Sequence, residues 1–144
     1  MGEFQEAGIR ATGTSVPRRV AASFNRSNSQ LDHERLDVYT AAVDLNGAVV
    51  ALARKAGRGR GWLGDQATRA SASVVLNPAE ALGREGLYRA RTLRIARGSA
   101  LEVDAAPTLL LHRGACRAEA RATVKTLTVR VVAILTVLRN RAAP

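Results

Sequence analysis

Apolar residues recur at alternating three- and four-residue steps along most of the chain after residue 30, a spacing typical of amphipathic helices. The clearest instance lies between Arg84 and Leu111. One apolar seam there consists of Leu93, Ala96, Ala100, Val103 and Leu110. Small residues around Gly98 keep this segment thin, which allows a neighbouring backbone to come close. We therefore expect a helix that packs on other helices.

Three further segments repeat this periodicity. The first runs from about Asp32 to Ala56 with Ser29 or Asp32 as its N-cap. The others run from near Trp62 to about Leu82 and from about Ala118 to Arg141. Short breaks, each containing glycine, separate the four segments. The pattern predicts an all-α fold, an antiparallel up-down-up-down four-helix bundle.

Two prolines fall inside the predicted helices, where proline removes a backbone donor and clashes with the preceding turn. Pro78 predicts either a kink at Leu76-Asn77 or a second helix that restarts there with Asn77 as its cap. Pro107 predicts that the third helix bends or ends near residues 105–106.

Residues 1–30 lack apolar periodicity and are rich in Gly, Ser, Asn and Arg, so we expect a disordered or loosely ordered extension before a bundle at 31–144. No signal-peptide pattern and no apolar run of membrane-spanning length is visible. One cysteine, Cys116, excludes an internal disulfide. These features together predict a soluble, cytoplasmic protein without a membrane partner.

Composition adds a strong positive charge. The 144 residues include 22 Lys+Arg against 12 Asp+Glu, a net charge of +10, and every basic residue except Lys55 and Lys125 is arginine. Residues 57–97 alone hold eight basic and three acidic residues, a net +5. The excess therefore lies within the predicted helices, where it would attract a polyanion. The alternative is that these arginines only solvate a helical surface.

The candidate nucleic-acid contacts lie in this interval. The principal set is Arg84, Arg91 and Arg94, and the supporting set is Arg89, Arg97, Arg58, Arg60 and Arg69. We expect contacts mainly to phosphate, because recognition by shape needs no base readout. Aromatic residues make up only 3% of the chain, which disfavours a stacking platform for single strands. Alternatively, some of these arginines pair with Glu85, Asp65 or Asp104 of another subunit.

Other chemistry has little support in the sequence. His112 and Cys116 lie four apart, and with His33 they are too few and too scattered for a zinc site. Ser99 and Cys116 have no base and orienting group at a recognisable spacing. We therefore predict no catalytic residues, no metal site and no cofactor. The first and last helices are apolar over a wide arc, which predicts a homo-oligomer.

Four short stretches carry a resemblance to a known family: Leu31 to Tyr39, Leu63 to Gln66, Asn77 to Glu80, and Ile95 to Glu102. In order and spacing they resemble the four-helix bundle proteins of the 23S rRNA intervening-sequence family. These are relatives of the accessory proteins that work with reverse transcriptases in diversity-generating retroelements. The resemblance implies a homopentamer of small antiparallel bundles with no established catalytic activity. It begins near Leu31 and extends to the C-terminus.

The resemblance also implies roles for particular residues and surfaces. The retroelement relatives bind nucleic acid through basic surfaces and contact the reverse transcriptase. Asn77, Glu80, Ser99 and Glu102 match the family, and we expect them to make helix-to-helix hydrogen bonds. Pro78 departs from the isoleucine that the family usually has there.

The predicted function is a non-enzymatic oligomeric bundle that binds structured RNA or DNA through arginine. One alternative is an adaptor that docks a partner such as a reverse transcriptase. The other is an oligomer without a ligand.

Overall fold

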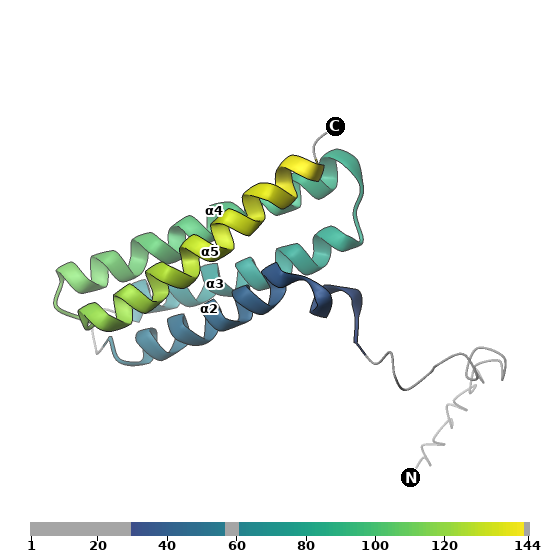
Figure 1. Ribbon diagram of the computed structural model, residues 1–144. Helices are drawn as coiled ribbons and strands as arrows, with labels where there is room; N and C mark the ends of the chain where they lie inside the picture. Colours follow the sequence, from purple (N-terminus) through teal and green to yellow (C-terminus); the bar gives the residue numbers. More distant parts are fainter. Residues whose placement is uncertain (1–29, 57–60, 143–144) are drawn as a thin grey trace, which may run out of the picture.

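The computed structural model describes residues 30–56 and 61–142, and the regular elements in these ranges are all helical (Figure 1). They are a 3-10 turn η2 (Asp32–Arg35) and four α-helices, α2 (Asp37–Arg54), α3 (Gly61–Leu82), α4 (Gly86–His112) and α5 (Ala118–Ala142). The extension expected at 1–30 lies, except for residue 30, outside the described residues.

The four helices form a closed bundle. α2 packs against α3 and α5, and α4 packs against the same two helices, so that each helix has two neighbours. The α3–α4 and α4–α5 connections lie at opposite ends of the bundle in Figure 1. The predicted all-α, antiparallel up-down-up-down bundle is confirmed.

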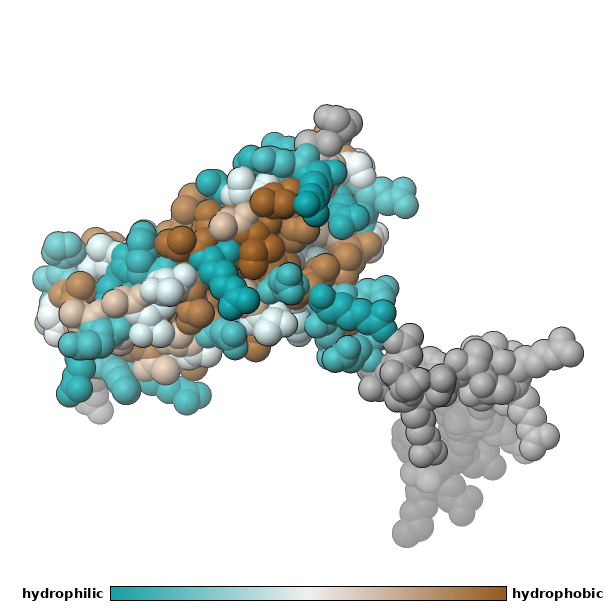
Figure 2. All heavy atoms as spheres, in the orientation of Figure 1, coloured by the Kyte–Doolittle hydropathy of each residue, from teal (hydrophilic) through white to brown (hydrophobic). Residues whose placement is uncertain are grey.

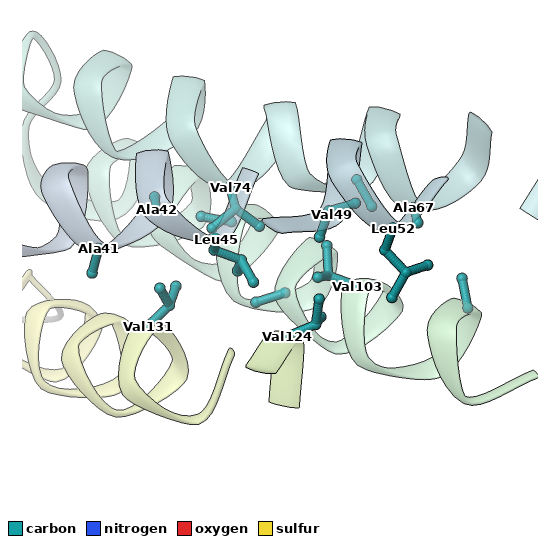
Figure 3. Close-up of a cluster of buried hydrophobic side chains, with 14 of the residues drawn as sticks. Ala41, Ala42, Leu45, Val49, Leu52, Ala67, Val74, Val103, Val124 and Val131 are labelled. Atoms are coloured by element: carbon teal, nitrogen blue, oxygen red, sulfur yellow. The ribbon is translucent and has the colours of Figure 1, made fainter. Parts of the chain in front are cut away.

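The core is built from small and medium aliphatic side chains. Figure 3 shows Leu45 and Val49 of α2 pointing toward Val74, Val103 and residues of α5. The buried hydrophobic residues among those described are alanine, valine and leucine, with no aromatic ring among them. Thin side chains let the helices approach closely. At Gly64 a Cβ would lie 3.2 Å from the Cβ of Ala53, so α2 and α3 nearly touch there.

Both prolines lie inside continuous helices. α3 runs through Pro78 and α4 runs through Pro107, and both rings are fully buried. The expected restart at Asn77 and the expected end near residues 105–106 are therefore wrong. Asn77 is not a cap, because its Nδ2 donates to the carbonyl oxygen of Ser73 at 2.9 Å. Burial in the core holds each helix together despite the hydrogen bond that its proline removes.

The first predicted helix is broken near its start. Leu36 has extended backbone angles (φ −82°, ψ 126°) and separates η2 from α2. The Glu34 carboxylate accepts the Leu31 N–H at 2.6 Å and closes the short turn. Leu36 is the N-cap of α2, so the expectation that Ser29 or Asp32 caps this helix is wrong, and Ser29 itself lies outside the described residues.

Candidate nucleic-acid interface

The α3–α4 side of the bundle holds most of the principal candidate residues. A connection of three residues, 83–85, joins the two helices and makes them antiparallel neighbours. The hydroxyls of Ser73 and Ser99 hydrogen-bond across them at 2.8 Å, and Gln66 Nε2 donates to Glu102 Oε2 at 3.0 Å. Ser99 and Glu102 thus make the helix-to-helix hydrogen bonds expected of them.

A pocket of about 250 Å³ lies between these helices near their connection. Its lining consists of Asn77, Glu80, Arg84, Tyr88, Arg91, Thr92 and Ile95, and we call it the α3–α4 pocket. It brings together two of the three principal arginines. Asn77 and Glu80, which were expected to bond between helices, instead bond to Ser73 of the same helix and to Arg84 of the connection.

Arg84 is an exposed arginine with a carboxylate partner. Its Nε donates to Oε1 of Glu80 at 2.9 Å, and its Nη2 contacts the same oxygen. Both side chains are about half exposed (46% and 51%). An ion pair this exposed contributes only about 0.2–1 kcal/mol, so Arg84 can exchange Glu80 for another anion at little cost.

Arg91 and Arg94 are exposed on α4 and make no hydrogen bond or ion pair within the described ranges. Residues three apart are neighbours on a helix surface. The two guanidinium groups therefore offer adjacent, uncompensated positive charge beside the α3–α4 pocket.

The supporting arginines are divided among other parts of the surface. Arg69 is exposed on α3, and its Nη2 donates to Oε1 of Gln66 at 2.9 Å. Because Gln66 also binds Glu102 of α4, Arg69 lies on the same side of the bundle as the α3–α4 pocket. Arg58 and Arg60 lie outside the described residues.

Arg97 and Arg89 face away from this side. Arg97 is partly buried, and its Nε donates to Thr136 Oγ1 of α5 at 3.1 Å. Arg89 is also partly buried, and its Nε has no hydrogen-bond partner among the described residues. The candidate set is thus not one continuous surface.

Tyr88 was missed as a site residue by sequence reasoning, which counted it only among the few aromatic residues. Its spacing to Arg91 places both on one side of α4, and this signal was available. The spacing along α4 does not predict that Asn77 and Glu80 line the same pocket as Tyr88, because this depends on the register between α3 and α4.

A second cavity, of about 440 Å³, lies at the α4–α5 connection and includes Lys55, Cys116 and Arg117 in its lining. Burial raises the pKa of the Cys116 thiol, and the nearby Arg121 partly opposes this shift. The thiol donates to the Pro107 carbonyl oxygen at 3.7 Å, and no base binds it among the described residues. This is a poor setting for a nucleophile, because the thiolate is the reactive form.

Across residues 30–56 and 61–142, no three His, Cys, Asp or Glu side chains gather in a way that could hold a metal ion. No helix within these ranges has the length and apolar character needed to cross a membrane.

In a comparison with protein families, residues 34–137 match the family described as 23S rRNA-intervening sequence protein. The chain belongs to this family. The match to the 23S rRNA-intervening sequence proteins begins in η2 and ends in the last turns of α5, so it includes all of α2, α3 and α4. The resemblance noted from four short stretches is thereby confirmed. A search of curated proteins found no match.

Proposed function

We propose that this 23S rRNA-intervening sequence protein is a non-enzymatic bundle that binds structured RNA or DNA through Arg84, Arg91 and Arg94. The observation that carries the proposal is the exposure of Arg91 and Arg94 without a carboxylate partner among the described residues. Guanidinium groups form bidentate hydrogen bonds with phosphate oxygens, and their binding releases counterions from the nucleic acid. Arg84 adds a third charge at the edge of the same surface.

Affinity for duplex RNA and duplex DNA at a series of salt concentrations tests this proposal. We expect the triple variant Arg84→Glu, Arg91→Glu, Arg94→Glu to bind more weakly than the wild type at every salt concentration. We also expect a shallower salt dependence, with the slope of log K against log salt smaller by about 0.9 for each phosphate that the variant no longer neutralises. Fluorescence anisotropy of labelled duplexes measures both quantities.

A matched control separates a defined surface from bulk charge. The variant Arg54→Glu, Arg113→Glu, Arg117→Glu changes the net charge by the same amount at exposed positions outside both the α3–α4 pocket and α5. It should lose much less affinity than the first variant. Equal loss in the two variants, or no binding by the wild type at low salt, would contradict the proposal.

Association of several copies is the second part of the proposal. Exposed large hydrophobic side chains include Val43, Leu101, Leu109, Val129 and Val137. On the face drawn in Figure 2, hydrophobic residues gather over the middle and C-terminal half of α5. Apolar surface that is grouped in this way favours contact with another protein surface. A homo-oligomer would cover it, and the family resemblance implies a pentamer.

An adaptor that docks a partner protein, such as a reverse transcriptase, is the alternative function. It is favoured by exposed apolar side chains on the helix that also carries the arginines: Leu87, Leu101 and Leu109 of α4. A docking role predicts that Leu101→Glu with Leu109→Glu abolishes partner binding in a pull-down, whereas Arg91→Glu with Arg94→Glu has a smaller effect. The nucleic-acid role predicts the reverse order for duplex binding.

A further inference from the structure

The α3–α4 pocket contains an aromatic ring without a partner. Tyr88 is 69% exposed, and its ring makes no ring contact within the described residues. Ile95, also exposed, and Thr92 extend the pocket wall along α4. A free aromatic face beside cationic groups is the arrangement on which nucleic-acid bases stack.

Two guanidinium groups lie beside this ring. Arg91 is free of ion pairs among the described residues, and Glu80 holds Arg84 at the pocket wall. Arg84, Tyr88 and Arg91 line the same pocket, so both guanidinium groups are within reach of a phosphate attached to a base on the ring. Arginine is well suited to this role, because its planar donors match a phosphate.

The size of the pocket limits what it can hold. Pockets for drug-sized ligands are about 300–1,000 Å³, and this one is about 250 Å³. It therefore suits one small planar group better than an extended segment of chain.

The polar groups of the pocket set a preference among bases. Nδ2 of Asn77 donates to both the carbonyl and the hydroxyl oxygen of Ser73, each at 2.9 Å, which leaves Oδ1 as an acceptor. Glu80 uses Oε1 for Arg84, and its Oε2 remains as a second acceptor. Both free groups accept and neither donates, so they favour a base with an exocyclic amino group.

We propose that the α3–α4 pocket receives one unpaired nucleotide of a structured nucleic acid. Its base stacks on Tyr88 and its phosphate binds Arg84 and Arg91. Adenine, cytosine and guanine fit better than uracil, because each has an amino group that can donate to Asn77 Oδ1 or Glu80 Oε2, whereas the single N3–H of uracil lies between two carbonyl oxygens. This inference rests on the proposed nucleic-acid function and adds to it a defined structural element of the target.

Two RNA hairpins with the same stem test the inference, one fully paired and one with a single bulged adenosine. At one salt concentration, the wild type should bind the bulged hairpin about five-fold or more tighter, the lower end of a typical base–aromatic stacking effect. Tyr88→Ala should bring the bulged hairpin down to the affinity of the paired one and leave the paired hairpin unchanged. A bulged uridine should bind more weakly than a bulged adenosine.

Two variants serve as controls. Tyr88→Phe keeps the ring and should retain the preference for the bulge. Leu87→Ala removes an equally exposed neighbour (66% exposed) and should also retain it. Because Leu87 and Tyr88 are both exposed, none of these substitutions should change the helix content measured by circular dichroism.

The outcomes separate this inference from the function on which it rests. Equal affinity for the bulged and paired hairpins would overturn the pocket assignment and leave duplex binding intact. A preference for the bulge that survives Tyr88→Ala would also overturn it. If Tyr88→Ala left the affinities for both hairpins unchanged, the pocket would serve another ligand, such as a partner protein, and the inference would be wrong. If the wild type bound neither hairpin, the proposed function itself would be overturned.

Discussion

Asp104 shows how single contacts decide which charges are available to a partner. Its Oδ1 accepts from Arg121 Nη2 and its Oδ2 from Lys125 Nζ, each at 3.0 Å. Two cations of α5 are thereby compensated within the chain. The sequence suggested Asp104 as a partner for arginines of another subunit. Within the chain, Asp104 joins α4 to α5. Net charge alone therefore overstates the attraction for a polyanion, whereas Arg91 and Arg94 keep their charge uncompensated by any described residue.

Cys116 gives a prediction for thiol chemistry. Burial raises the pKa of its thiol, so at a given pH near neutrality the folded protein holds less thiolate than an unfolded chain. Alkylation by iodoacetamide should be slower in the native protein than in a short peptide with the same local sequence. The midpoint of the rate against pH should also lie higher. Arg121→Gln should raise that midpoint further, because the arginine lowers the pKa. A native midpoint at or below that of the peptide would contradict this.

The positions of the helices along the chain were largely predictable, because apolar periodicity alone indicates where an amphipathic helix runs. The ends of α5 and of α3 follow the pattern closely. Local rules misjudged Pro78 and Pro107, since a buried proline is retained where packing of the whole helix outweighs one missing hydrogen bond. The break at Leu36 between η2 and α2 was not predicted, because an extended residue at this point does not change the spacing of the apolar residues.

The site was only partly predictable for a related reason. Helical spacing alone places Arg91 and Arg94 on one side of α4. The inward direction of Arg89 and the contact of Arg97 with Thr136 depend on where α5 packs. Such contacts arise between helices, and the spacing within one helix does not contain them.

The end of α4 provides a prediction for backbone conformation. Gly114 has φ +63°, its N–H donates to the Leu111 carbonyl at 2.9 Å, and the Ala115 N–H donates to the Leu110 carbonyl at 2.8 Å. This is a Schellman motif, which needs a left-handed residue. No atom crowds a Cβ at Gly114, so Gly114→Ala should lower the free energy of unfolding by about 1–2 kcal/mol through backbone strain alone. Urea denaturation followed by circular dichroism measures this change.

Gly47 is the matched control for this substitution. It lies inside α2, is exposed and has equally open space at its Cβ position, but its φ is not positive. Gly47→Ala should therefore stabilise the protein, by up to about 1 kcal/mol. The same sign of change at both glycines would contradict the assignment of strain to Gly114.

The four helices together present two kinds of surface. The α3–α4 side carries Arg84, Arg91 and the pocket between them, whereas α5 exposes Val129 and Val137. α5 packs between α4 and α2 and has no extensive contact with α3. Copies that associated through α5 would bury apolar surface and leave much of the basic side accessible, and a ring of copies would present it repeatedly. Several basic surfaces on one assembly would raise the avidity for a long nucleic acid.

This arrangement predicts the behaviour of the protein in solution. Light scattering coupled to size-exclusion chromatography should give a mass that is a multiple of the 15.3 kDa chain. Val129→Glu with Val137→Glu should reduce the mass to that of one chain, because two charges would have to be buried at the contact. Leu87→Glu, at an exposed position on α4, should leave the assembly intact. A single-chain mass for the wild type would contradict association altogether, whereas dissociation by Leu87→Glu alone would move the contact from α5 to α4.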